Sequence, residues 1–287
     1  MNSVRLRTLL VLGRVSNLPT LWSNCLAGWW LAGGGNFKTL PWLLMGTSFL
    51  YLGGMYLNDA FDVSFDRQRR AERPIPSGQI SLSAVWKLGV AWLALGLLFL
   101  FFISGWAGLL GLVLVTFIVV YNATHKFITV SPWLMGACRF WVYVIAGTTG
   151  ADGLNGWPIV CGLALALYIV GLSYVARRES FRGPPLPLGP LIFLAAPIIL
   201  ALLMNSGKFL PPTLVVAGVL AGWALLWVWP VLFGGAINVG IIVSNLLAGI
   251  VLVDWLAIAP MASTWLFLIY LALFSLTLLL QQFVPAT

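Results

Sequence analysis

Charged side chains are scarce in this sequence: they make up 8% of its 287 residues, whereas about 25% is usual for a soluble domain. Hydrophobic residues make up 61% instead. Apolar runs of about twenty residues, enough to cross a hydrocarbon core of about 30 Å, recur along the whole chain. This composition leaves no separate soluble domain, and we expect the lipid bilayer to surround most of the protein.

Residues that build common metal and nucleophilic sites are also few. The single histidine, His125, excludes haem ligation by two histidines and argues against a histidine-based zinc site. The three cysteines, Cys25, Cys138 and Cys161, fall inside apolar runs without metal-like spacing, so we interpret them as small packing residues. No Ser/His/Asp or Cys/His arrangement indicates a nucleophilic side chain.

Acidic residues are outnumbered: 7 Asp and Glu stand against 15 Lys and Arg, for a formal charge of +8. In a soluble chain this excess would suggest nucleic acid, but positive-inside topology explains it better here, and we expect no nucleic-acid partner. With the N-terminus in the cytoplasm, the outside segments hold only Lys38 and Lys208. The N-terminus and the polar loops are therefore predicted to be cytoplasmic, in a multi-pass protein of a bacterial inner membrane.

Apolar runs between polar residues, proline and glycine predict one domain over residues 1–287. Its fold class is all-α, a polytopic transmembrane helical bundle of about nine or ten helices. The expected spans are 18–34, 41–60, 83–103, 107–122, 132–150, 156–176, 188–205, 211–232, 236–257 and 262–283.

Four of the 7 acidic residues, Asp59, Asp62, Asp66 and Glu72, lie within the stretch NDAFDVSFDRQRRAERPIPSG. At about 100° per residue, a helix would place Asn58 and the three aspartates on one face. Three like charges on one face repel one another unless a cation lies among them. Hard oxygen donors suit Mg²⁺, whose shell water and phosphate oxygens would complete. The alternative is a solvated loop whose acids balance the neighbouring arginines.

The pattern NDxxDxxxD at residues 58–66, followed by RPIPSG at 73–78, resembles the first signature of the UbiA superfamily of intramembrane prenyltransferases. The resemblance implies the helical bundle of that family, Mg²⁺ dependence and an isoprenyl diphosphate donor. It implies that Asp62 and Asp66 hold the metal ion. Asn58 and Asp59 are implied as further metal partners, and all four as catalytic residues.

Two shorter segments support this resemblance: RVSNLP at residues 14–19 and YNATHK at residues 121–126. The second is one residue longer than the Tyr-x-x-x-Lys of the family. The resemblance implies catalytic roles for Tyr121 and Lys126. It also implies diphosphate-binding roles for several basic and polar side chains, namely Arg14, Asn17, Arg73 and Lys126.

The sequence departs from the family at the second signature, where a second pair of aspartates is usual. Residues 173–183 read SYVARRESFRG and contain no aspartate, which puts a second Mg²⁺ site in doubt. In a helix, Tyr174, Arg178 and Arg182 share a face, and with Arg177 they are predicted to bind diphosphate oxygens directly. An ordinary positive-inside loop is the alternative. This loop resembles the EboC-type branch of the superfamily.

Asp254 lies near the predicted outer end of its span, far from the acidic motif in sequence. We therefore expect it to be exposed at a helix terminus and to take no part in catalysis.

These features predict a transferase that moves a prenyl group from an allylic isoprenyl diphosphate to an aromatic or polar acceptor, which the sequence does not identify. The alternative is a non-catalytic isoprenoid-binding, lipid-binding or transport protein on the same bundle, favoured by the incomplete second signature. A CDP-alcohol phosphotransferase would also use membrane aspartates, but its Asp-Gly-x-x-Ala-Arg opening is absent.

Overall fold

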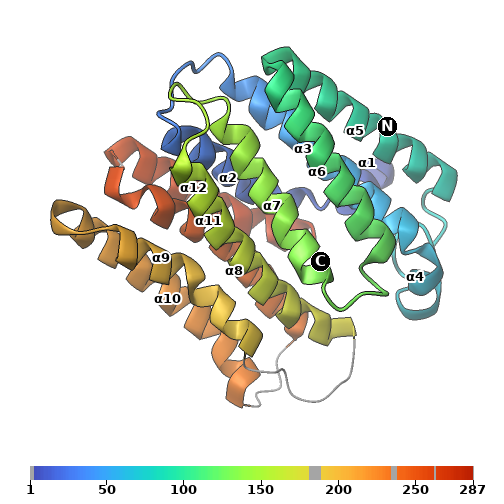
Figure 1. Ribbon diagram of the computed structural model, residues 1–287. Coiled ribbons are helices and arrows are strands. Elements are labelled where there is room, and N and C mark those ends of the chain that lie inside the picture. The colour runs from blue at the N-terminus through green and yellow to red at the C-terminus, as the bar shows by residue number, and fades with distance from the viewer. Residues whose placement is uncertain (1–2, 181–188, 234–237, 262, 287) are drawn as a thin grey trace.

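The protein is a single bundle of helices in the computed structural model, which describes residues 3–180, 189–233, 238–261 and 263–286. Side chains are described from residue 6 onward, except at 178–180 and 231–233. These residues contain helices and no strand, which confirms the predicted all-α class. Figure 1 shows the helices packed side by side, with α9 and α10 along one outer edge.

The α-helices, in chain order, are α1 (Ser3–Leu12), α2 (Leu18–Leu31), α3 (Leu40–Phe61), α4 (Val63–Arg69), α5 (Leu82–Ile103), α6 (Gly105–Thr124), α7 (Ser131–Gly147), α8 (Gly156–Ser180), α9 (Ala196–Met204), α10 (Leu210–Phe233), α11 (Val239–Ile258) and α12 (Thr264–Phe283). Short 3₁₀ turns join some of them: η1 (Val15–Asn17), η2 (Gly189–Ala195), η3 (Gly207–Phe209) and η4 (Ala259–Met261).

Each predicted span corresponds to a helix whose ends follow local chemistry. The first turns of α2, α3 and α7 contain Pro19, Pro41 and Pro132. Backbone N–H groups in the first turn make no hydrogen bond within the helix, so proline, which lacks an N–H, is tolerated there. Ser81 and Ser104 cap α5 and α6 by accepting hydrogen bonds from backbone amides of the first turn. The span expected at 188–205 differs, because its first part is the 3₁₀ helix η2.

Seven described helices are long and apolar enough to cross a membrane: α3, α5, α6, α8, α11 and α12, together with α10 and the η3 turn before it. Large apolar side chains point outward from this set; Phe102 and Trp106, for example, are 69% and 72% exposed. Inside, the described residues form three apolar clusters, and α2 and α7 contribute side chains to the two larger ones. These two helices therefore connect the larger clusters.

Connections gather at two ends of the bundle. At one end, the loop at 32–39 pairs with the loop at 148–155 through the amides of Ala151 and Asp152, which donate to Gly34 and Ala32. At the other end lie residues 62–81 and the loop at 125–130. We call this the polar end, because the charged motif and most of the loop arginines lie there.

Asp254 is fully buried inside the bundle, so the prediction that it is surface-exposed is wrong. Its carboxylate accepts hydrogen bonds from Ser23 and Asn24 of α2 and from Tyr143 of α7. Asn24 in turn accepts a hydrogen bond from Arg139 of α7. Hydrogen bonds from α2 and α7 offset the free-energy cost of burying this carboxyl group. Both helices are distant from Asp254 in sequence, so the residues around Asp254 did not reveal these partners.

The contact between α3 and α5 depends on small residues that alternate with leucines on both helices. Gly53 faces Leu93 and Gly89, while Gly89 faces Leu57; Gly46 and Gly96 repeat the arrangement further along. A Cβ added at Gly53 would lie 2.8 Å from the Leu93 side chain and 2.9 Å from the Gly89 carbonyl oxygen. The two helices therefore approach closely enough that a side chain on Gly53 has no room.

Replacing Gly53 with alanine should push α3 and α5 apart and destabilise the protein by about 1–3 kcal/mol. The matched control is Gly218→Ala on α10, where a Cβ meets no atom within 4 Å. There alanine should stabilise the helix by up to about 1 kcal/mol. Thermal unfolding of both variants in detergent measures the difference, and equal shifts would contradict the close packing of α3 on α5.

Candidate active site

The acidic motif forms a nearly continuous helix across the junction of α3 and α4. Asp62 lies between the two helices with helical dihedral angles, and its amide donates to the carbonyl of Asn58. The amide of Asp66 donates in turn to the carbonyl of Asp62. Asn58, Asp59, Asp62 and Asp66 are all at most 8% exposed. The predicted shared face is therefore confirmed, and it points into the protein rather than to solvent.

Arg14 contacts the beginning of this face from the turn between α1 and α2. Its Nη2 donates to Asn58 Oδ1 at 3.1 Å and to Asp59 Oδ1 at 3.2 Å. Among the described residues, Arg14 is the one non-glycine residue with a positive φ, 41°. Such a conformation is strained for a side chain of this size and persists only where surrounding contacts hold it. Here those contacts place its guanidinium on the motif.

Arg73 reaches the same carboxylates from the RPIPSG segment, which folds into a compact turn. The amide of Ser77 donates to the carbonyl of Arg73, and Gly78 adopts a positive φ of 75° that favours glycine. Arg73 Nη1 lies 3.2 Å from both Asp59 Oδ1 and Asp66 Oδ2. The turn thus brings a cation between two carboxylates that would otherwise repel each other.

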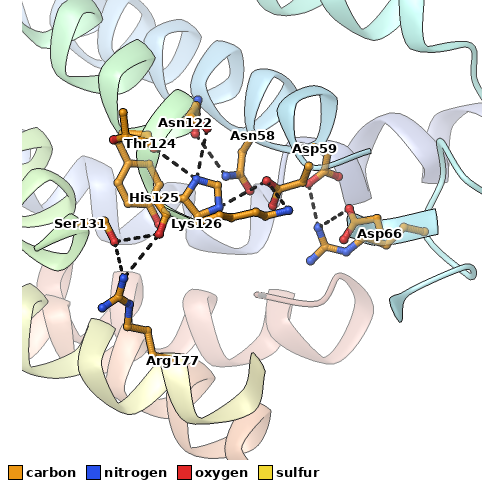
Figure 2. Close-up of polar contacts among 12 residues, drawn as sticks. Asn58, Asp59, Asp66, Asn122, Thr124, His125, Lys126, Ser131 and Arg177 are labelled. Carbon is orange, nitrogen blue, oxygen red and sulfur yellow. Dashed lines mark hydrogen bonds and ion pairs between the residues drawn. The ribbon is translucent and has the colours of Figure 1, made fainter. Parts of the chain in front are cut away.

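The stretch after α6 faces the motif from the opposite side (Figure 2). His125 Nε2 lies 3.3 Å and Lys126 Nζ 2.8 Å from Asp62 Oδ1. Asn122 accepts a hydrogen bond from Asn58 at 3.2 Å and donates to the carbonyl of Gly54, which fixes α6 against α3. The site therefore joins residues 58–66 to residues 122–126.

The electrostatics of the two metal-candidate carboxylates differ. Burial alone would raise the pKa of Asp62, but the interactions with His125 and Lys126 outweigh burial and lower the pKa. Burial raises the pKa of Asp66, because Arg73 compensates only in part and the negative charges of Asp62 and Asp59 oppose ionisation. Burial and the nearby positive charge of Arg14 lower the pKa of Arg73.

Of the residues predicted to bind diphosphate in the second signature, only Arg177 and Tyr174 have described side chains, and only Arg177 lines the central cavity. Arg177 donates to the carbonyls of Ile128 and Thr129 and to Ser131 Oγ, at 2.6, 2.7 and 3.0 Å. It therefore holds the loop that carries Lys126, although it also lines the central cavity. Tyr174 is not among the described residues that line that cavity, and its role in diphosphate binding stays a prediction. The Arg178 side chain and all of Arg182 lie outside the described residues.

A cavity of about 630 Å³ opens beside the motif and extends into the bundle. Its polar end is lined by Arg14, Asn17, Asp62, Asp66, Arg73, Tyr121, His125, Lys126 and Arg177, and its inner part by Tyr51, Met55, Met135, Arg139, Ile169, Leu172 and Leu247. A smaller, mostly apolar cavity of about 80 Å³ shares several of these residues and continues toward Leu21, Leu114 and Val142. The site is therefore charged at its mouth and largely apolar beyond it.

Three residues at this cavity were missed or undervalued by sequence reasoning. Asn122 and Arg139 lie inside apolar spans, and their spacing gives no periodic signal that connects them to the motif. The motif assigned no role to His125, yet it contacts Asp62 as Lys126 does. A usable signal did exist for Asn122 and Arg139, because a polar or charged residue inside a membrane span is itself a reason to expect function.

The donor set fits one divalent cation better than several. Asp62 Oδ1 is buried, and within the described residues it has ion-pair contacts but no hydrogen bond of good geometry. Mg²⁺ commonly binds through one or two carboxylates and takes water and phosphate oxygens for the rest of its shell. In the described part of the chain, no three His, Cys, Asp or Glu side chains are grouped to hold a metal ion by themselves. Asp62 and Asp66 thus suit an ion shared with a phosphate.

Comparison with known proteins finds similar sequences over part of the chain. Digeranylgeranylglyceryl phosphate synthase of Methanocaldococcus jannaschii is 28% identical over 183 residues, which cover 62% of this chain and 64% of the relative. Protoheme IX farnesyltransferase of Alkalihalophilus pseudofirmus is 27% identical over 55% of this chain and 53% of the relative. The chain therefore spans less than two thirds of the length of either relative.

Solved structures share the fold at lower identity. A UbiA homologue from Aeropyrum pernix superposes with a TM-score of 0.69 over 88% of this chain and 99% of that one, at 17% identity. A UbiA homologue from Archaeoglobus fulgidus bound to GPP and Mg²⁺ gives 0.53 over 96% and 97%, at 18% identity. The resemblance to the EboC-type branch stays a prediction. The model of the UbiA prenyltransferase family matches residues 18–235, and this multi-pass integral membrane protein belongs to that family.

Proposed function

We propose that this protein transfers a prenyl group from an allylic isoprenyl diphosphate to an acceptor, at the cavity described above and with Mg²⁺ as cofactor. One observation carries the proposal: Asp62 and Asp66 lie at the charged mouth of a cavity whose interior is largely apolar. A prenyl diphosphate has the same division, with a charged head and a hydrocarbon tail. The relatives named above include a farnesyltransferase and a digeranylgeranylglyceryl phosphate synthase.

The residues suggest how such a transfer would proceed. Arg14, Arg73 and Lys126 supply positive charge at the mouth, where the bond between the allylic carbon and the diphosphate oxygen breaks and its electron pair leaves with diphosphate. The aromatic faces of Tyr51 and Tyr121 line the cavity inward of these cations and can stabilise positive charge on the allyl group. The acceptor then attacks that carbon and loses a proton.

Mg²⁺, held by Asp62 and Asp66 with Asn58 and Asp59 nearby, would neutralise charge on the diphosphate. In the described structure these side chains are paired with Arg14, Arg73, His125 and Lys126 instead. The same cations can turn from the carboxylates to phosphate oxygens when a donor is bound. The basic residues therefore have two roles, holding the buried carboxylates before binding and contacting the donor after it.

The orientation predicted from loop charge also belongs to this proposal. The polar end contains residues 62–81 and 125–130, so it faces the cytoplasm if the positive-inside rule holds. A soluble or membrane-bound diphosphate donor would then enter from the cytoplasmic side. In the described part of α8, the residues at the cavity include the apolar Leu172 and Ala176 and no carboxylate.

Asp62→Asn and Asp66→Asn should each abolish most Mg²⁺-dependent donor binding, by more than about 10-fold, because each removes a charge from a shared ion. The double variant should be little worse than either single variant, since the interaction is already lost. Binding of a non-hydrolysable prenyl diphosphate analogue, measured with and without Mg²⁺, tests this. Glu72→Gln is the matched control, because Glu72 lies exposed on the same segment and outside the central cavity.

Additive losses in the double variant would instead show that Asp62 and Asp66 act separately. Release of diphosphate from a labelled donor distinguishes the enzyme from a non-catalytic isoprenoid-binding protein. If donors of several chain lengths bind but neither diphosphate release nor prenyl transfer is detected, the protein is a non-catalytic isoprenoid-binding protein.

Arg177→Ala should free the loop at 125–130, because it removes the hydrogen bonds to the carbonyls of Ile128 and Thr129. We expect faster amide hydrogen exchange in that loop and weaker donor binding, with Arg177→Lys falling between alanine and the wild type. Lys208→Ala, at an exposed cation of the opposite end, is the control. Weaker donor binding with unchanged hydrogen exchange would mean that Arg177 contacts the diphosphate rather than the loop.

A cysteine at Ser77, exposed on the polar-end turn, should be protected from an impermeant thiol reagent added to intact cells. A cysteine at Lys38, exposed at the opposite end, should react. The measurement uses a chain whose own cysteines are replaced with alanine. Labelling at position 77 but not at 38 would reverse the proposed orientation.

A further inference from the structure

Arg139 of α7 is an unusual residue for the interior of a membrane bundle. It lies more than two helical turns from Ser131 at the polar end of α7, yet it is only 8% exposed. Among the described residues it is the one lysine or arginine in the buried set. A charge at such depth costs several kcal/mol unless partners stabilise it, and it generally marks a functional site.

The partners of Arg139 come from α2 and hold it in one orientation. Nη1 donates to Asn24 Oδ1 at 2.6 Å, and Nη2 donates to Thr20 Oγ1 at 3.2 Å. The amide of Asn24 donates in turn to Asp254 at 2.6 Å, which connects the guanidinium to a buried carboxyl group. The guanidinium also lies 5.9 Å from the centre of the Tyr51 ring.

This arrangement leaves part of the guanidinium available to a ligand. A guanidinium has five N–H donors, and the hydrogen bonds to Asn24 and Thr20 use two of them. Arg139 lines the central cavity and also the smaller apolar one. It is therefore a fixed cation at the inner wall of the space in which transfer is proposed to take place.

Neither part of a prenyl diphosphate accounts for a cation at this place. The diphosphate has Arg14, Arg73, His125 and Lys126 at the mouth, and the hydrocarbon tail gains nothing from a guanidinium. The remaining participant is the acceptor. We infer that Arg139 binds an anionic oxygen, carboxylate or phosphate, of the acceptor and thereby places the attacking atom beside the allylic carbon. This inference rests on the proposed function.

The test measures binding of paired probes to the purified full-length protein without any donor. One pair is 4-hydroxybenzoate and its uncharged amide, and the other is octyl phosphate and octanol. An anion of at least one pair should raise the melting temperature of the wild-type protein, while its neutral partner should not. In Arg139→Gln the affinity for that anion should fall by about 10- to 100-fold, with Arg139→Lys between the two.

Two further variants separate Arg139 from the other cations. Lys126→Gln removes a mouth cation and should retain the anion effect, as should Lys208→Gln at the exposed opposite end. Loss of the effect in Lys126→Gln with retention in Arg139→Gln would place the anion at the diphosphate site and overturn the inference. The inference is also overturned if, in both pairs, the anionic and the neutral probe change the melting temperature equally. Should the Arg139 variants fail to fold, the retained effect in Lys126→Gln still decides between the two sites.

The outcome is separable from the proposed function. If anions bind through Arg139 but no donor is ever cleaved or transferred, the anion site at Arg139 stands, whereas prenyl transfer and the acceptor role fall. If a labelled prenyl group passes to a neutral acceptor and no anion stabilises the protein, prenyl transfer stands and the role of Arg139 does not.

Discussion

Burial of negative charge at the end of an apolar bundle is the constraint around which the polar end is organised. Asp59, Asp62 and Asp66 lie within one continuous helical face, and each has a cation from another segment within 3.3 Å. Those cations come from the turn before α2, the turn after α4 and the end of α6. Because a buried carboxylate without a partner would be strongly unfavourable, the carboxylates determine where these three segments meet.

The same pairing explains why the site is asymmetric. At the polar end, charged side chains come from the turn before α2, the α3–α4 segment, the turn after α4 and the α6–α7 segment, whereas α8 lines the cavity with Ile169, Leu172 and Ala176 before reaching Arg177. Arg177 hydrogen-bonds to the α6–α7 loop and so supports the position of Lys126. Among the described residues of the second signature, Arg177 thus acts in part through the neighbouring loop.

The sequence predicted those features that depend on neighbouring residues. Helical spans follow from apolar runs, and the shared face of Asp62 and Asp66 follows from their spacing of four residues. It did not predict the burial of Asp254, because the compensating groups are on α2 and α7 and nothing in the local pattern of α11 names them. Arg177 was assigned to the diphosphate from its charge, whereas backbone carbonyls of a distant loop, which carry no sequence signal, determine where it points.

The glycine and leucine contacts between α3 and α5 determine the position of the helical face that carries the carboxylates. Gly46 and Gly53 lock α3 at one height against α5, and the carboxylates follow directly at the end of the same helix. One residue inserted between Gly53 and Asn58 would rotate that face by about 100° and shift it by about 1.5 Å, away from Arg14 and Lys126. The register of α3 against α5 therefore determines where the carboxylates lie relative to Arg14 and Lys126.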